Sequence, residues 1–336
     1  MTALFEAKDA IVRFYGRHET VMNALMKFVL ALAAFGTINL EIGYMSRLAN
    51  IPVTLILAVL AALLPVNFIV FLGSLLVVAH LYALSLEVCA VGAAILLVIM
   101  LLYFRFTPRT GYNTVVTAVL FRLHVPYIMP VTVGLLETPA AMLSVVSGTV
   151  IYYFLAGVKE NEALLSASVE DSSSVSVIAV ALKQLFGNRE MFLVLVTFVI
   201  MMLIIYIIRR MSIDHAWTIA FISGIITEVV ILLSGYLIFG MSDRILWLVI
   251  GNIITVPIAF LLQLLFFNLD YSRIERVQFE DDEYYYYVKA VPKICMTEKE
   301  KQVTLISGSR DRDSERRTIS RRELAEEMDI DEDLLD

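Results

Sequence analysis

Long apolar runs separated by short polar segments make up most of the first 270 residues. A helix needs about 20 apolar residues to cross a hydrocarbon core that is about 30 Å thick. Because runs of this kind recur, the pattern predicts an all-α polytopic membrane protein with about eight transmembrane helices. The predicted spans are residues 21–40, 53–64, 66–84, 86–104, 140–158, 191–208, 215–239 and 245–267.

The second and third spans come from one run, residues 51–85, which is too long for a single crossing. Pro65 and Asn67 interrupt this run, and proline lacks the backbone donor that continues a helix. We therefore expect a short helix that turns into a full one. A single kinked and tilted helix is the alternative.

The stretch 112–137 is apolar enough to enter a bilayer, yet it cannot form one ordinary helix. Pro126 and Pro130 remove backbone donors, and Arg122 at membrane depth costs several kcal/mol unless it is paired or hydrated. The pattern predicts a broken helix that faces protein or water. Such an element either crosses the membrane or re-enters, so that it begins and ends on one side.

Two amphipathic helices are predicted to lie along the membrane surface. One covers residues 1–20, and the other follows a polar linker within residues 159–190. Each ends in a similar motif directly before a span, FYGRHE at 14–19 and LFGNRE at 185–190. This match indicates either a duplicated unit of inverted orientation or a chance similarity between two helices that end at glycine.

Positive charges decide between an eight-crossing and a nine-crossing topology, because Lys and Arg concentrate in cytoplasmic segments. Arg209 and Arg210 face the cytoplasm only if residues 112–136 re-enter, which leaves eight crossings. We therefore expect a plasma-membrane protein with both termini in the cytoplasm and the linker 159–190 outside.

The composition is that of a membrane protein with a charged tail. Of the 336 residues, 59% are hydrophobic and 18% are charged, and the mean hydropathy is +0.80. The transmembrane domain covers residues 21–270. The net charge of -7 arises mainly from the cytoplasmic tail, residues 271–336, which holds 12 Lys and Arg against 18 Asp and Glu. Two cysteines, Cys89 and Cys295, are too far apart in sequence to imply a disulfide.

Ionisable residues inside or near the predicted spans are the candidates for a transport pathway, because a charge in the membrane is costly to keep without a function. Glu228 lies near the centre of its span. A protonated carboxyl that bonds to a neighbouring helix and a role in proton or cation coupling explain it equally well. Residues near span ends can be interfacial, and Arg122 can extend its charged end to the surface. The candidates are His80, Glu87, Arg122, His124, Glu137 and Glu228.

The chain contains none of the short catalytic motifs that carry a known mechanism. There is no G-x-x-x-x-G-K-[ST] phosphate loop and no H-E-x-x-H, C-x-x-C or G-x-S-x-G motif. We therefore expect neither an enzyme nor a cofactor, metal or nucleic-acid site. If the protein uses ATP, a separate subunit must hydrolyse it.

The tail carries a distinctive block of four tyrosines after the acidic residues 280–283. Aromatic residues favour strands, so this block predicts a short β-strand that pairs with a partner's tail or folds on the membrane face. A recognition motif for a cytoplasmic protein, or a site of tyrosine phosphorylation, is the alternative. The mixed charges after residue 299 predict disorder. The tyrosines are Tyr284, Tyr285, Tyr286 and Tyr287.

Four segments carry a resemblance to known proteins: LLPVNFIVFLGSLLVVAHLYALSLEV, LLYFRFTPR, VPYIMPVTVGLLETP and RIERVQFEDDEYYYYVKAVPK. Together they resemble multi-pass proteins of Gram-positive anaerobes that are labelled ABC transporter permease. The resemblance implies that the tail and the membrane part form a unit. It also implies a separate nucleotide-binding subunit as a partner, and a homo-oligomer is a further expectation.

The broken element and the central ionisable residues favour a permease-like transport component. The competing hypothesis is a non-enzymatic membrane scaffold for cell-envelope or division machinery, which would act through its tyrosine-rich tail.

Overall fold

The computed structural model describes residues 2–166, 174–211, 213, 215–266, 275–280 and 285–290. The chain divides into two units, Met1–Leu269 and Asp270–Asp336, and the first unit holds all of the described helices. The predicted disorder after residue 299, Tyr284 and the last residue of the final predicted span lie outside the described residues.

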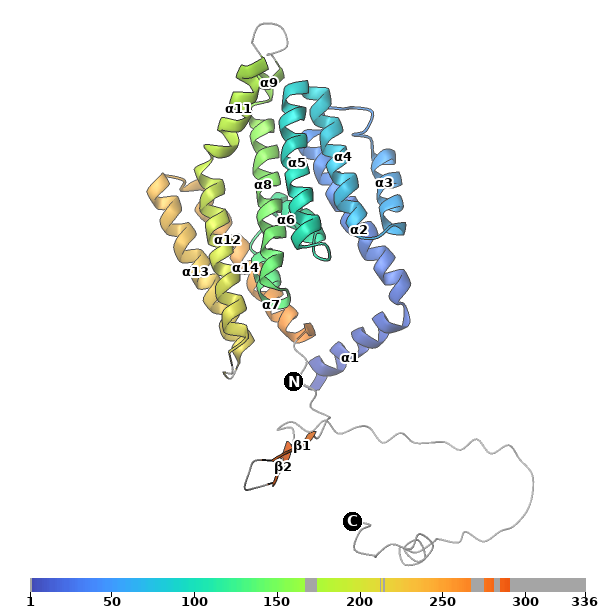
Figure 1. Ribbon diagram of the computed structural model, residues 1–336, viewed down its shortest axis with the longest axis vertical. Helices are drawn as coiled ribbons and strands as arrows, with labels where there is room; N and C mark the ends of the chain where they lie inside the picture. The colour runs from blue at the N-terminus through green and yellow to red at the C-terminus, as the bar shows by residue number, and fades with distance from the viewer. Residues whose placement is uncertain are drawn as a thin grey trace, which may run out of the picture. The chain divides into compact units, whose positions relative to one another are not determined.

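The first unit consists of helices joined by short connections (Figure 1). Its elements are α1 (Thr2–Arg17), α2 (Glu19–Ile42), α3 (Ile51–Leu63), α4 (Asn67–Leu84), α5 (Leu86–Phe106), α6 (Tyr112–Arg122), α7 (Ile128–Leu136), the 3-10 helix η1 (Pro139–Ala141), α8 (Met142–Glu160), α9 (Glu162–Ser166), α11 (Ser174–Phe186), α12 (Arg189–Arg209), α13 (Ala216–Phe239) and α14 (Asp243–Phe266).

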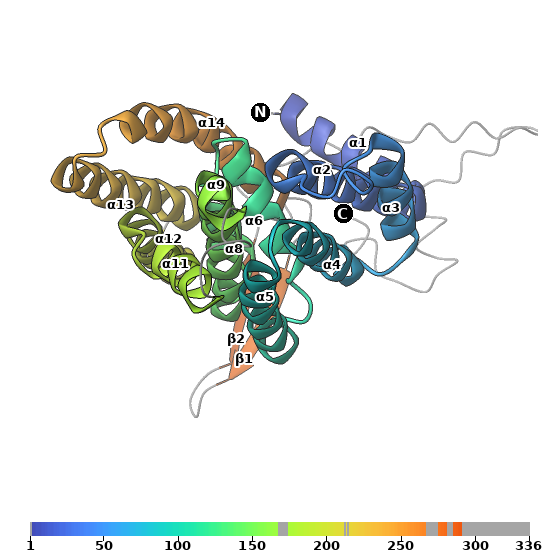
Figure 2. The ribbon, with the colours of Figure 1, turned by 90° about the horizontal axis from the view of Figure 1, so that it is seen from above.

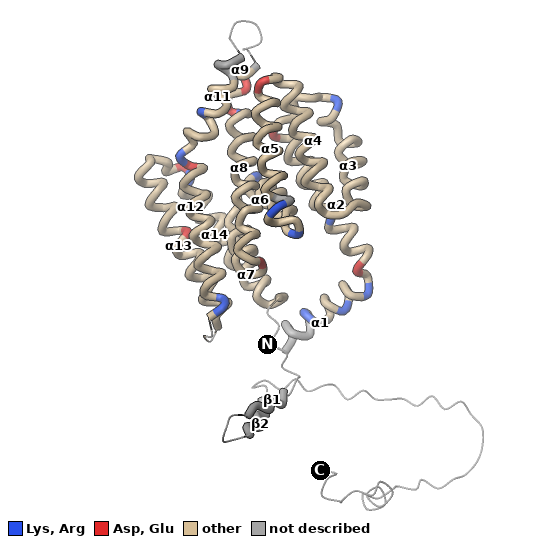
Figure 3. The backbone as a smooth tube through the Cα atoms, in the orientation of Figure 1, with Lys and Arg blue, Asp and Glu red and all other residues tan. Residues whose placement is uncertain are grey.

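Six helical segments among the described residues are long and apolar enough to cross a membrane, which supports a polytopic membrane protein. They are α2, α4, η1 with α8, α12, α13 and α14. Figure 3 shows that the charged residues of these long helices lie mainly near their ends. The apolar part of α5, residues 86–102, and the whole of α3 are shorter. Crossing by these two helices therefore stays a prediction.

The run 51–85 forms two separate helices, α3 and α4, so the two-helix prediction is confirmed. The chain is extended at Leu64, and Pro65 follows it. The break leaves carbonyl groups at the end of α3 without partners in the helix. Lys27 on α2 donates from Nζ to the Leu64 carbonyl over 3.0 Å, which gives one of these carbonyls a partner.

Three layers make up the bundle, as Figure 2 shows from above. A first lobe of α2–α5 and a second lobe of α12–α14 flank a central layer of α6, α7 and α8. Within the central layer, α6 packs against α8, α2 and α4, whereas α7 packs against α12, α13 and α14. The two halves of the broken stretch, α6 and α7, therefore pack against different lobes.

The break between α6 and α7 is a Schellman motif, a helix ending closed by two backbone hydrogen bonds. His124 adopts the left-handed conformation with a φ of 60° and donates its backbone N–H to the Phe121 carbonyl over 3.0 Å. Val125 donates to the Leu120 carbonyl over 3.0 Å. Pro126 follows immediately, and Pro130 lies in the first turn of α7, where no intrahelical donor is needed. The predicted break is thus present, and the two prolines stand where they cost least.

The hairpin formed by α6 and α7 begins and ends at one end of the bundle. Its turn lies near the C-terminal end of α2, because Arg122 forms an ion pair with Glu41. Its far end lies at the C-terminal end of α12, where Arg209 donates to the backbone carbonyls of Leu135 and Glu137. This geometry is the one that a re-entrant element requires.

Helices α2 and α12 run in opposite directions. Lys159 near the end of α8 contacts Glu41 near the end of α2 over 2.8 Å, whereas Tyr153 on α8 contacts Glu190 at the start of α12 over 3.2 Å. The predicted amphipathic helices are present as α1 and α11, and each leads after a short break into one of these two antiparallel helices. An inverted duplication stays a prediction that this arrangement allows.

The second unit contains one antiparallel hairpin of β1 (Glu275–Glu280) and β2 (Tyr285–Ala290). Three of the four tail tyrosines fall in β2, where Tyr285 pairs with Glu280, Tyr286 with Phe279 and Tyr287 with Gln278. The pairing partner of this strand is thus a segment of the same chain.

Candidate functional site

A cavity of about 140 Å³ lies at the turn of the α6–α7 hairpin. It has room for several water molecules, since one water needs at least about 10–15 Å³ on this measure. The cavity is lined by residues of the hairpin turn, α8, the start of α12, α13 and α14. It therefore lies between the central layer and the second lobe. We call it the turn cavity. Its lining is Phe121, His124, Pro126, Tyr127, Tyr152, Tyr153, Ala156, Gly157, Glu160, Asn188, Glu190, Val194, Tyr236, Arg244 and Trp247.

Glu190 is the least exposed of the three residues Glu160, Glu190 and Arg244 that line the turn cavity. Its Oε2 lies 3.2 Å from Nη2 of Arg244, and its Oε1 accepts a hydrogen bond of 3.2 Å from the Tyr153 hydroxyl. The Glu190 side chain is 16% exposed, whereas that of Arg244 is 47% exposed. Asn188 forms the N-cap of α12 by accepting from the Met191 N–H over 3.0 Å, which fixes where this helix begins.

Aromatic rings form much of the remaining wall. His124 stacks on Trp247 with ring centroids 4.2 Å apart, and Phe121 stacks on Tyr152 at 4.7 Å. Tyr127 packs closely against α14, since a side-chain carbon added at Gly251 would lie 2.5 Å from its ring. Glycine is therefore required at this position for the hairpin turn to contact α14 so closely.

Polar side chains continue from the turn cavity along the interface of α13 and α14. Three pairs of polar residues occur at successive depths. Tyr236 and Arg244 both line the turn cavity, whereas Glu228 with Asn252 and Thr218 with Gln263 are within hydrogen-bonding distance. On α14 the steps between them are about 12 Å and about 16 Å at 1.5 Å per residue. We call these three pairs the polar row. It extends over nearly the full length of both helices.

Glu228, in the middle of the polar row, is fully buried. Its Oε1 lies 3.4 Å from Nδ2 of Asn252. Its Oε2 and the Oδ1 of Asn252 have no hydrogen-bond partner among the described residues. A protonated carboxyl that donates to Asn252 Oδ1 would satisfy both of these oxygen atoms, because Asn252 offers both a donor and an acceptor.

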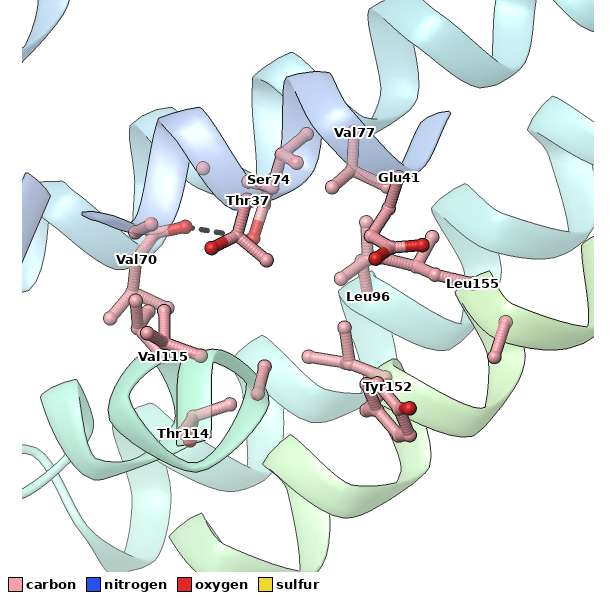
Figure 4. Close-up of a pocket in the computed structure, with 17 residues that line it drawn as sticks. Thr37, Glu41, Val70, Ser74, Val77, Leu96, Thr114, Val115, Tyr152 and Leu155 are labelled. Atoms are coloured by element: carbon pink, nitrogen blue, oxygen red, sulfur yellow. Dashed lines mark hydrogen bonds between the residues drawn. The ribbon is translucent and has the colours of Figure 1, made fainter. Parts of the chain in front are cut away.

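A second cavity, of about 80 Å³, lies on the other side of α8, between the central layer and the first lobe. Its lining is almost entirely apolar, and Tyr152 and Ala156 of α8 border both cavities. Figure 4 shows Glu41 and Tyr152 at one end of this cavity, with Val70 and Val115 at the other. Glu41 holds both Arg122 and Lys159 at that end.

Two of the six predicted membrane candidates, Arg122 and His124, come together at the hairpin turn. Glu228 lies deeper, in the polar row. Glu137 lies at the far end of the hairpin beside Arg209, where burial raises the pKa of its carboxyl and the guanidinium partly offsets this. The structure thus distributes these four residues along the α6–α7 hairpin and the second lobe.

His80 and Glu87 lie elsewhere and have local partners. His80 accepts the Met45 backbone N–H at Nδ1 over 3.1 Å, and its Nε2 lies 2.8 Å from Oδ1 of Asn39. This arrangement fixes the loop after α2 to α4. Glu87 accepts from the Ser85 hydroxyl over 2.6 Å in the first turn of α5, where a carboxylate is favourable.

Sequence reasoning missed the charged residues that define the turn cavity. Glu190, Arg244 and Glu160 lie at predicted span ends, where charge is ordinary, so no local signal separated them from interfacial residues. The motif LFGNRE at 185–190 is the one signal that could have found Glu190.

The described part of the chain contains no group of three or more His, Cys, Asp or Glu side chains that could hold a metal ion. Comparison with known proteins finds no matching family model, no matching curated protein and no matching solved structure. Function must therefore be argued from the geometry of the site.

Proposed function

We propose that the protein is a membrane transport component whose pathway follows the polar row of the second lobe, with the turn cavity as its binding site. The observation that carries this proposal is the depth of the polar row. Arg244, Asn252 and Gln263 occupy one face of α14 over nearly its full length, and each has a polar neighbour on α13.

Such a series is costly in a membrane protein that only needs to be anchored. Ionisable and amide side chains in spanning helices are rare, face the interior of the bundle, and mark substrate or ion pathways. The broken α6–α7 element adds to the argument, because transporters commonly place substrate and ion sites at discontinuous helices. Tyr127, in the turn of this hairpin, lines the turn cavity together with Tyr236, so a movement of the hairpin would alter access from this cavity to the polar row.

Cysteine accessibility tests the pathway without knowledge of the substrate. In a Cys89→Ser, Cys295→Ser background, Thr255→Cys places a thiol beside Asn252, and Ala156→Cys places one in the turn cavity. We expect charged, water-soluble thiol reagents to modify both positions, because thiolates form in water and not in lipid. A pathway with alternating access further predicts that Thr255→Cys reacts from either side in oriented vesicles.

Ile253→Cys is the matched control. Ile253 is on α14 next to Asn252 and is 66% exposed on the outer surface of the bundle. Its thiol should resist the same reagents. Complete protection of Thr255→Cys from both sides would sink the pathway, since no water would then reach the middle of the polar row.

We further propose that a separate nucleotide-binding subunit or a second copy of the chain assembles with this protein, in keeping with the resemblance to ABC transporter permeases. Affinity purification from the native membrane tests this partnership. Recovery of a nucleotide-binding protein in stoichiometric amount supports it.

The scaffold hypothesis has its own supporting observation, which is the separate tail unit with a hairpin of β1 and β2. Deletion of residues 276–293 distinguishes the two functions. If the protein is a scaffold, the deletion should abolish the recovery of envelope-synthesis or division proteins. If it is a transport component, the deletion should leave the reactivity of Thr255→Cys towards water-soluble thiol reagents unchanged.

A further inference from the structure

The charges of the turn cavity favour a positively charged ligand. Two carboxylates, Glu160 and Glu190, and a single guanidinium, Arg244, line it together with His124. The two carboxylates and the guanidinium together contribute a net charge of -1 to the lining. The opposite end of the bundle differs, because Arg209 and Arg210 lie there, with Glu137 beside Arg209.

The aromatic rings favour the same class of ligand. Tyr127, Tyr152, Tyr153, Tyr236, Phe121 and Trp247 surround the cavity from five different elements. The faces of aromatic rings attract organic cations, and cages of such rings are used to bind quaternary ammonium groups. An inorganic cation gains less here, since two of the fifteen lining residues carry a carboxylate.

Arg244 occupies the position that a ligand cation would take. It reaches Glu190 through one contact of 3.2 Å, which is not the paired geometry of a strong guanidinium–carboxylate interaction. The Arg244 side chain is about half exposed, so its guanidinium can move from the carboxylate into water with little change in its surroundings. Glu190 would then remain with Tyr153 as its hydrogen-bond donor.

We propose that the turn cavity binds an organic cation with an aromatic or quaternary ammonium group, and that the cation displaces Arg244 from Glu190. This inference names the substrate class of the proposed transport site and so rests on the proposed function. Glu190 is the counter-ion, Trp247 and Tyr152 supply stacking surfaces, and Arg244 keeps Glu190 paired when the cavity holds no ligand.

Binding of N-methylacridinium and of neutral acridine to the purified protein in detergent tests the proposal. The two probes share one ring system and differ in permanent charge. We expect the cation to bind more tightly than the neutral probe. Glu190→Gln should weaken binding of the cation at least about tenfold, whereas Arg244→Gln should strengthen it about tenfold, because the competing charge is removed. Neither variant should change binding of acridine.

Glu160→Gln provides a second variant at the exposed end of the cavity, in case Glu190→Gln fails to fold. It should weaken binding of the cation about threefold. Arg210→Gln at the opposite end is the control and should leave binding unchanged. Equal binding of the two probes, or binding of the cation that is insensitive to both Glu190→Gln and Glu160→Gln, would overturn the proposal.

The binding assay and the cysteine accessibility test distinguish failure of the cation site from failure of the proposed transport function. Water access at Thr255→Cys without any charge-dependent binding overturns the cation site and leaves a pathway for another substrate. Charge-dependent binding with a fully protected residue 255 supports the cation site and removes the transport role.

Discussion

Arg122, at the turn of the α6–α7 hairpin, forms an ion pair with Glu41 at the C-terminal end of α2. The same carboxylate binds Lys159 of α8 over 2.8 Å. One acidic side chain therefore joins the first lobe to two elements of the central layer. The arginine that looked costly inside a membrane segment is paired where that segment turns.

Glu41→Gln should cost more stability than loss of either cation. Each partner is more than 40% exposed, so Arg122→Gln or Lys159→Gln should cost at most about 1 kcal/mol. Glu41→Gln removes both interactions and should cost about 1–2 kcal/mol. Thermal unfolding of the three variants in one detergent gives the comparison. A Glu41→Gln protein as stable as Arg122→Gln would show that the ion pair between Glu41 and Lys159 adds no stability.

Glu228→Gln should leave the fold intact or stabilise it slightly. The amide is close to isosteric with the carboxyl and can donate to Asn252 Oδ1 as a protonated carboxyl would; no other described residue donates to this oxygen. Glu228→Ala should cost about 1–3 kcal/mol, because it leaves a cavity and Asn252 then keeps only the hydrogen bond from its Nδ2 to the Leu248 carbonyl. Unfolding in detergent measures both changes. If the two variants proved equally unstable, the Glu228 side chain would contribute by its charge and not by its hydrogen bond.

Gly148→Ala should destabilise the contact between α8 and α6. An added side-chain carbon at this position would lie 2.4 Å from the Thr114 carbonyl oxygen, which belongs to the backbone and cannot move away alone. Gly36→Ala on α2 is the matched control, because it meets no atom within 4 Å and should gain up to about 1 kcal/mol of helix propensity. Melting temperatures shifted in the same direction by both substitutions would contradict the close approach.

Ser242→Cys and Cys295 should label from opposite sides of the membrane. Ser242 is exposed in the turn between α13 and α14, at the end of the bundle that the eight-crossing prediction expects outside. A membrane-impermeant thiol reagent should modify Ser242→Cys in intact cells, in a background without the native cysteines. Cys295, in the Cys89→Ser background, should react only after permeabilisation. Labelling of both in intact cells would refute the eight-crossing topology.

Tyr44, in the loop after α2, predicts a specific loss of stability at high pH. Burial, with smaller contributions from Glu162 and Glu41, raises the pKa of Tyr44 to about 12 from the ordinary value of 10.0. The unfolded chain therefore releases this proton first, and the folded state loses stability as the pH rises from about 10 to 12. Tyr44→Phe should reduce this slope. It should also stabilise the protein at neutral pH, because the hydroxyl has no hydrogen-bond partner among the described residues.

Hydropathy determined much of the first unit without knowledge of any contact. The helices at residues 51–63 and 67–84, and the break between Arg122 and Ile128, follow from apolar length and from proline chemistry, which are local properties. The position of the α6–α7 turn could be narrowed to Pro126 and its neighbours, because a residue that precedes proline disfavours the helical conformation.

The sites needed the tertiary structure. Glu41 forms ion pairs with Arg122 and Lys159, and Glu190 forms one with Arg244. In each case the partners lie far apart in the sequence. Asn252 is a neutral amide without a local signal of function, and only antiparallel packing places it opposite Glu228. Partners of this kind depend on which helices are neighbours and on their register. A pattern of apolar residues fixes that a helix is buried, but it does not fix against which helix its polar side chains lie.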